Sequence, residues 1–138
     1  EHFAAGESRE IFTLKGFRIC PMICYDLRFP VWSRGANEFD LLVYVANWPV
    51  ARRSAWQTLL PARAVENQCY VAGVNRTGTD GREIAYAGDS AVYDYLGPPL
   101  AGPGPDNGHC TVTLSLTDLN RYREKFPAWR DADDFRLA

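Results

Sequence analysis

Cys24 is the residue whose type and position best suit covalent chemistry. It ends the apolar, strand-like segment 17–24, and the following segment 26–36 is compatible with a helix. A thiol at such a strand-to-helix turn lies beside the positive end of the helix, which favours the thiolate, and the N–H of Tyr25 would be free to bind an oxyanion. A buried structural cysteine is the alternative, and position alone would favour it.

Two asparagines also stand at the ends of strand-like segments. Asn47 follows the apolar run 39–46, and Asn75 ends the run 69–75. Because an open α/β sheet carries its ligand site at the carboxyl ends of its strands, we expect Cys24 and both asparagines to share one edge of a sheet. Asn47 and the adjacent Trp48 are therefore candidates for the lining of a substrate pocket.

The elements that must position these residues alternate along the chain, which predicts an α/β fold with a mixed sheet. The clearest helix is expected over 52–68, with a kink at Pro61, which cannot donate a backbone hydrogen bond. The other expected elements are a 9–14/17–24 hairpin around Lys15-Gly16, a Pro30-led helical turn, strands 91–95 and 110–116 around a Gly- and Pro-rich loop 97–108, and a helix capped by Thr117 that runs to about Phe126.

Composition restricts the classes of protein. The 138 residues suit one domain, and the 46% hydrophobic content can supply a core. A net charge of −2 with mixed signs does not indicate a nucleic-acid or membrane surface. The longest apolar stretch is too short to cross a bilayer, and segment 1–9 lacks the order of a signal peptide. We therefore expect a cytoplasmic protein without nucleic-acid or membrane partners.

The four cysteines could in principle form two disulfides. Cys20, Cys69 and Cys110 lie in or beside apolar runs, however, which favours buried free thiols. A zinc site is disfavoured because the C-x3-C pair has no second pair and the sequence contains only two histidines. We expect no metal and no other cofactor.

The segment Cys24-Tyr25-Asp26-x-Arg28-Phe29-Pro30 resembles the signature of the nitrilase superfamily of carbon–nitrogen hydrolases. The resemblance extends over essentially the whole chain, and the tail segments 123–129 and 135–137 are similar to the bacterial omega-amidase-like branch. Further motifs of the family follow in order: LLVYVANWP (41–49), Arg52-x3-Trp56, LLPARAVEN (59–67), Asn75-Arg76-x-Gly78-x-Asp80 and Tyr86-x-Gly88-Asp89-Ser90.

The resemblance implies an α-β-β-α sandwich, a homodimer and a Glu–Lys–Cys triad in which Cys24 forms a thioester. A second glutamate supports the site in this family, and Glu1, followed by a histidine, matches it. The base glutamate and the lysine of the family lie upstream of that glutamate. Only Lys15 and Lys125 occur here, both expected far from Cys24. We therefore expect residues 1–138 to be the C-terminal, cysteine-bearing part of one hydrolase domain, which needs the N-terminal part.

The resemblance also implies the substrate, a small 2-oxo-dicarboxylate monoamide such as 2-oxoglutaramate. Arg28 and Arg52 are the candidates for binding its carboxylate. A structural pair of Arg28 with Asp26 is the favoured alternative, and Arg63 and Glu66 are expected to pair along a helix. Hydrolysis of a nitrile or an N-carbamoyl compound, and a non-catalytic fragment, remain the competing functions.

Overall fold

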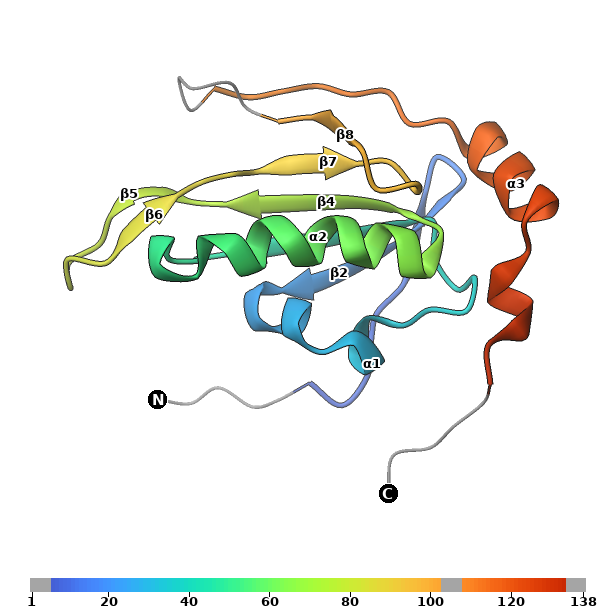
Figure 1. The fold of residues 1–138 in the computed structure, drawn as a ribbon, viewed down its shortest axis with the longest axis horizontal. Coiled ribbons are helices and arrows are strands. Elements are labelled where there is room, and N and C mark those ends of the chain that lie inside the picture. The colour runs from blue at the N-terminus through green and yellow to red at the C-terminus, as the bar shows by residue number, and fades with distance from the viewer. Residues whose placement is uncertain (1–5, 103–107, 134–138) are drawn as a thin grey trace.

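The computed structural model describes residues 6–102 and 108–133 of the chain. One sheet has the strand order β1-β2-β3-β4-β7-β8, and β5 pairs with β6 in a separate hairpin (Figure 1). The strands are β1 Phe12–Leu14, β2 Phe17–Ile23, β3 Leu41–Ala46, β4 Tyr70–Asn75, β5 Thr77–Thr79, β6 Ala85–Ala87, β7 Ala91–Tyr93 and β8 Pro99–Ala101. The helices are η1 Cys24–Arg28, α1 Pro30–Ser33, η2 Val50–Arg52, α2 Arg53–Asn67, α3 Leu116–Lys125 and η3 Ala128–Asp131, where η marks a 3₁₀ helix.

The three central strands are parallel and level with one another. Ile23 of β2 pairs with Val45 of β3, and Val45 pairs with Val74 of β4. Strands β1 and β7 flank them in antiparallel orientation, so the sheet is mixed, as expected. Because β2, β3 and β4 end together, the residues that follow them gather at one edge of the sheet.

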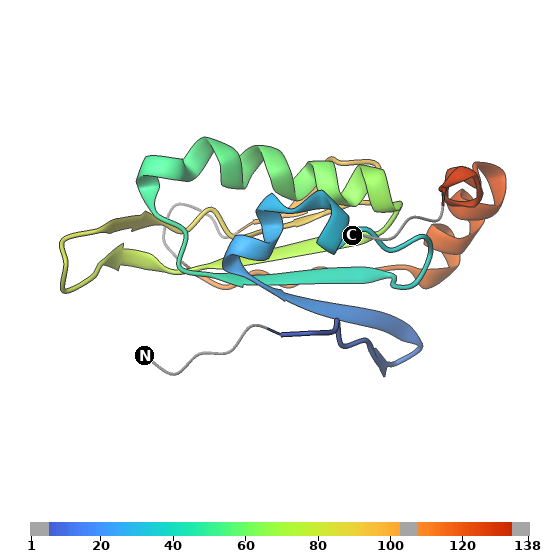
Figure 2. The same ribbon diagram turned by 90° about the horizontal axis from the view of Figure 1, so that it is seen from below.

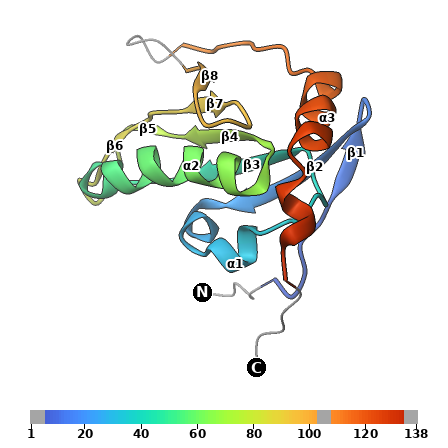
Figure 3. The same ribbon diagram turned by 45° about the vertical axis from the view of Figure 1, so that its right-hand side comes forward.

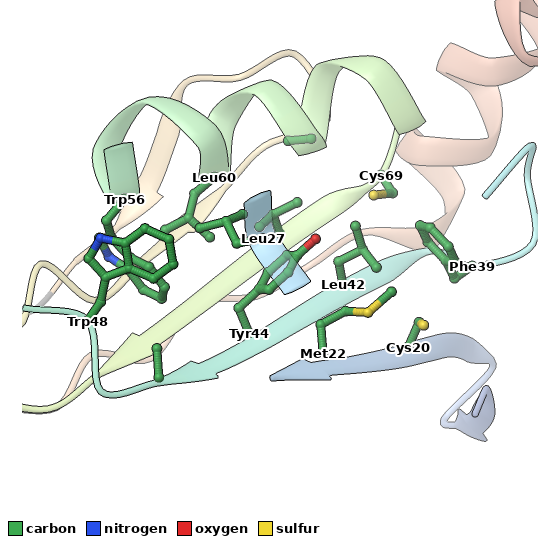
Figure 4. Packing of buried hydrophobic residues seen from close by; sticks show 13 residues of the cluster. Cys20, Met22, Leu27, Phe39, Leu42, Tyr44, Trp48, Trp56, Leu60 and Cys69 are labelled. Atoms are coloured by element: carbon green, nitrogen blue, oxygen red, sulfur yellow. The ribbon is translucent and has the colours of Figure 1, made fainter. Parts of the chain in front are cut away.

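One face of this sheet is covered by helices and holds the core. Figure 2 shows α1 and α2 on the same side of the strands. Trp56 and Leu60 of α2 are buried against side chains of β3 and β4, including Leu42 and Tyr44 (Figure 4). A side chain at Gly73 would come within 2.5 Å of Leu60, so the approach of α2 to β4 requires glycine. Each large apolar side chain buried here contributes roughly 2–3 kcal/mol.

The other face of the described sheet is uncovered and apolar. Side chains alternate across a strand, so the residues next to the buried ones point away from α2. Ile23, Val45 and Val74 lie side by side on this uncovered face and are 73%, 57% and 50% exposed. Such a row of aliphatic side chains is typical of a sheet that packs against a further layer.

The amino ends of β3 and β4 are closed by α3 (Figure 3). Arg123 of α3 donates to the carboxylate of Asp40 at 2.6 Å and to the carbonyls of Phe39 and Gln68. Arg18 of β2 reaches the same carboxylate at 2.7 Å. Burial alone would raise the pKa of Asp40, but the hydrogen bonds from Arg18 and Arg123 hold it below its usual value.

Most of the predicted elements are confirmed. The Lys15-Gly16 turn has positive φ at both residues, +49° and +86°, as a two-residue hairpin requires. Pro30 occupies the first position of α1. Helix α2 continues through Pro61 rather than dividing into two, and β3, β4 and β7 lie in their predicted segments.

Three predictions about elements are wrong. Segment 26–36 holds the end of η1 and the Pro30-led turn α1, as expected, but segment 110–116 forms no strand. The cap of α3 is Ser115, whose hydroxyl accepts from the N–H of Asp118, and not Thr117. The loop expected over 97–108 contains strand β8, and the β5–β6 hairpin was not predicted.

Candidate active site

Cys24 lies where β2 ends and η1 begins. Its backbone adopts φ +41°, in the left-handed region that residues with a side chain rarely occupy. The side chain is half-buried and packs against the core cluster beneath α2. A non-glycine residue persists in this conformation only where its surroundings impose it, and such strain is concentrated at functional sites.

The turn after Cys24 is closed by Asp26. Its carboxylate accepts from the N–H of Ile23 at 2.8 Å, and its carbonyl accepts from the N–H of Phe29 at 3.0 Å. The expected structural pair of Asp26 with Arg28 is therefore wrong, because the described residues show no ion pair between them and the carboxylate serves the backbone instead.

Arg28 and Trp48 lie against each other beside this turn. The guanidinium carbon is 5.1 Å from the centre of the Trp48 ring, a cation–π contact. Trp48 is buried, and its indole N–H donates to the carbonyl of Arg52 at 2.7 Å. Within residues 6–102 and 108–133, no carboxylate forms an ion pair with Arg28.

Asn75 joins the ends of β3 and β4. Its side-chain oxygen accepts from the N–H of Trp48 at 2.7 Å, and its amide donates to the carbonyls of Trp48 and Gly88. The strand-end register thus brings Asn75 and Cys24 to one edge, as expected, but the side chain of Asn75 is committed to the backbone. Asn47 and Arg52 are exposed at the same edge.

Tyr25 occupies the second position of η1. Its ring is 63% exposed and meets that of Phe29 edge-on, with the ring centres 5.3 Å apart. The first N–H groups of a helix have no acceptor within it, and the oxyanion contact of the Tyr25 N–H stays a prediction. The role predicted for Glu1 falls on a residue outside the described ranges.

Neither lysine lies near Cys24. Lys15 stands in the turn before β2, and Lys125 ends α3, which packs at the amino ends of the strands. A seven-residue strand separates the turn of Lys15 from Cys24, a distance of about 23 Å at 3.3 Å per residue. A cavity of about 590 Å³ beside the turn is lined by residues including Arg9, Ile23 and Phe29, with Cys24 not among them.

All four cysteines are free. Cys20 and Cys69 are buried as predicted, and burial raises the pKa of each thiol, which disfavours the reactive thiolate. The prediction for Cys110 is wrong, since this residue is exposed on a segment outside the sheet. The described residues contain no group of three or more His, Cys, Asp or Glu side chains that could hold a metal ion. No helix formed by the described part of the chain is long and apolar enough to cross a membrane.

The mixed sheet, its helical layer and the strained cysteine at a strand end define an α/β protein with a candidate nucleophile at the carboxyl edge of its sheet. Comparison with known proteins gives the family: residues 1–124 match the model of the carbon–nitrogen hydrolases, and the chain belongs to this family. The predicted resemblance and fold class are thereby confirmed.

The similar proteins agree with this assignment. Omega-amidase YafV of Escherichia coli K12 is 53% identical over 137 residues, which are 99% of this chain and 54% of that protein. The 2-oxoglutaramate amidase of Bacillus subtilis is 38% identical over 94% of this chain and 51% of its own length. The crystal structure of XC1258 from Xanthomonas campestris, a carbon–nitrogen hydrolase superfamily protein with an arsenic adduct in its active site, superposes with a TM-score of 0.92 at 49% identity, over 99% of this chain and 54% of that chain. The chain thus spans about half the length of the relatives it matches.

Proposed function

We propose that residues 1–138 carry the nucleophile of a thiol amidohydrolase. Its substrate is a small 2-oxo-dicarboxylate monoamide, such as 2-oxoglutaramate, which it converts to the dicarboxylate and ammonia. The observation that carries the proposal is Cys24 itself, a half-buried thiol in a left-handed conformation at the carboxyl edge of the sheet. The substrate class is supported by the names of the relatives, an omega-amidase and a 2-oxoglutaramate amidase.

The reaction has two covalent steps. A base glutamate takes the proton of the Cys24 thiol, the thiolate adds to the amide carbon, and the N–H of Tyr25 stabilises the oxyanion. The protonated glutamate then gives its proton to the amide nitrogen, and the tetrahedral intermediate collapses to a thioester as ammonia leaves. The glutamate next deprotonates a water molecule, which adds to the thioester. Collapse of this second intermediate releases the carboxylate product, and the glutamate returns the proton to the thiol.

Two further groups are required that the described residues do not offer near Cys24. We propose that the base glutamate and the lysine lie in an N-terminal part of the same domain, and that Glu1 supports them. The uncovered sheet face agrees with this proposal, because it leaves room for a further layer next to the thiol. The homodimer and the cytoplasmic location stay predictions.

Arg28 is the better candidate for the substrate carboxylate. It stands on the same short helix as Cys24, is held against Trp48 and has no carboxylate partner among the described residues. A planar guanidinium so fixed can bind a carboxylate through two parallel hydrogen bonds. Arg52 and Asn47, both exposed at this edge, and the buried Trp48 would complete the binding surface.

Alanine substitution of the four cysteines tests the nucleophile. In the complete protein, Cys24→Ala should reduce ammonia release from 2-oxoglutaramate to background. The matched variants Cys20→Ala, Cys69→Ala and Cys110→Ala should retain activity, although the first two should lose stability because their side chains are buried.

The same assay separates the competing functions. A complete protein that hydrolyses a nitrile or an N-carbamoyl compound faster than 2-oxoglutaramate would overturn the substrate assignment. Full activity of the Cys24→Ala variant would overturn the mechanism.

A further inference from the structure

The turn that carries Cys24 is held by an arginine of α2. Arg63 is only 4% exposed, and one of its terminal nitrogens donates to the carbonyl of Leu27 at 2.8 Å. The other terminal nitrogen pairs with Glu66 at 3.0 Å, which confirms the predicted ion pair. The guanidinium therefore connects α2 to the turn at a point three residues beyond the thiol.

A second connection reaches the turn from β3. The hydroxyl of Tyr44 donates to that of Ser33 at 2.8 Å, and the hydroxyl of Ser33 donates to the carbonyl of Asp26 at 3.3 Å. Tyr44 and Ser33 are both fully buried. Figure 4 shows Tyr44 beside Leu27, in the layer between the strands and α2. Two buried chains of hydrogen bonds thus end on consecutive carbonyls, those of Asp26 and Leu27.

These contacts lie where the backbone is under strain. A residue with a side chain in the left-handed region costs on the order of 1 kcal/mol or more, and the strained conformation relaxes unless neighbouring contacts oppose it. The chain restrains Cys24 on its N-terminal side by the bond from Ile23 to the carboxylate of Asp26, and on its C-terminal side by the bonds from Arg63 and Ser33.

We propose that Arg63 and Tyr44 are positioning residues, which hold the strained turn so that the thiol of Cys24 and the N–H of Tyr25 keep the geometry needed to attack an amide carbonyl. This inference rests on the proposed function. Neither residue touches the reacting atoms. A displacement of about 1 Å at a reacting centre can cost on the order of 100-fold in rate, so even a modest loosening of the turn should be measurable.

The cost of burying Arg63 supports a specific role. Its Nε is buried without a hydrogen-bond partner among the described residues, and its charge is removed from water. An aliphatic side chain would pack at this site without that penalty. What the guanidinium adds is the bond to Leu27 and the connection through Glu66.

The test compares two equally buried arginines in the complete protein. Arg63→Lys removes the forked contact near the thiol. Arg123→Lys makes the same change far from it, because Arg123 is also 4% exposed but binds Asp40 at the opposite edge of the sheet. We expect Arg63→Lys to lower kcat about tenfold with KM within about twofold, the pattern of an interaction lost in the transition state. Arg123→Lys should lower the thermal midpoint similarly and leave kcat within about twofold.

Equal losses of kcat in both variants, or none in Arg63→Lys, would overturn the inference. Should Arg63→Lys fail to fold, Tyr44→Phe decides, because it deletes one hydroxyl and keeps the ring; it should lower kcat about threefold with KM unchanged.

The alkylation rate of Cys24 in the folded variants provides a second readout. It should fall in Arg63→Lys and not in Arg123→Lys, and equal rates would also overturn the inference. A wild-type protein that releases no ammonia would refute the proposed function, whereas an active wild-type with an unimpaired Arg63→Lys variant would refute only this inference.

Discussion

Arg28 is the residue whose interpretation changes most between sequence and structure. A structural pair with Asp26 was favoured because Arg–carboxylate pairs commonly position loops, yet the Asp26 carboxylate accepts from the N–H of Ile23 instead. Arg28 instead rests on the ring of Trp48 and has no carboxylate partner within the described ranges. The contact with Trp48 holds the guanidinium beside the turn while its donors have no carboxylate partner among the described residues, which is the condition for recognising a carboxylate.

Replacing Arg28 by lysine keeps the charge but removes the fork. We expect Arg28→Lys to raise KM for 2-oxoglutaramate about tenfold, since one charge-assisted hydrogen bond is worth about 1.5 kcal/mol or more. KM for a short neutral amide should change less than about twofold. Arg52→Lys is the matched comparison, and steady-state kinetics on both substrates provide the measurement. If the charged and neutral amides respond equally, Arg28 only supports the structure.

For single residues, the sequence predicts those that belong to a short motif of neighbouring positions. Cys24 and Tyr25 are predicted site residues because segment 24–30 resembles a family signature, whereas the position of the thiol at a strand end would by itself favour a structural role. The connection from Arg63 to Leu27 could not be predicted, since it joins segments 36 positions apart. The local spacing predicts the ion pair of Arg63 with Glu66, but it does not indicate the contact with Leu27.

Among the elements, α3 is attached by charge as well as by apolar contacts, since Leu119 is fully buried and Tyr122 stacks on Tyr95. Arg123 crosses from α3 to Asp40, the residue before β3, and Arg18 reaches the same carboxylate from β2. Asp40 therefore joins α3 to β2 and β3. Removal of one member of such a buried group typically costs about 3–5 kcal/mol.

The carboxylate of Asp40 should make this attachment sensitive to acid. Its pKa lies below the usual value in the folded state because of Arg18 and Arg123, so the stabilisation is complete above about pH 4 and is lost as pH falls through the folded value. Asp40→Asn should lower the free energy of unfolding at pH 7 by about 3 kcal/mol. Urea midpoints of the complete protein at several pH values test this: the difference between wild type and Asp40→Asn should shrink below about pH 4. A difference that stays constant down to pH 2.5 would contradict it.

Elements were predictable where one segment determines its own environment. The continuous apolar run of β3 indicated a strand, and β3 is paired on both sides, with β2 and β4. Segment 110–116 has similar β-branched character, but a strand needs a partner, and the described residues supply none there. The β5–β6 hairpin is rich in glycine and polar residues, so its pairing left no periodic pattern.

In the described structure, one face of the sheet is covered by helices and the other face is uncovered. Helices cover the side of the sheet that holds Trp56 and Leu60, whereas Ile23, Val45 and Val74 stay exposed on the other. The thiol sits at the edge between the two faces. We therefore expect one N-terminal part of the domain to cover the apolar face and to supply the base glutamate and the lysine.

We expect the isolated 138-residue chain to release no ammonia and to aggregate, because its uncovered face is apolar and no lysine lies near Cys24. Co-expression with an N-terminal segment that carries the base glutamate and the lysine should restore both solubility and activity. Size-exclusion chromatography and an ammonia assay provide the measurement. As a control, Val45→Thr with Val74→Thr should improve the solubility of the isolated chain without restoring activity. A soluble, monomeric and fully active 138-residue protein would contradict the proposed triad.

Strands β2, β3 and β4 end at the same level, but the loops that follow them differ in how freely they can change in length. Residues that follow these strands form the candidate site, so an insertion there would displace Cys24 or the Trp48–Asn75 contact. Residues 81–84 at the tip of the β5–β6 hairpin are exposed and lie away from these contacts, so an insertion there would extend into solvent. Homologous chains should therefore differ in length mainly at this hairpin tip, while the turns directly after β2 and β3 keep a fixed number of residues.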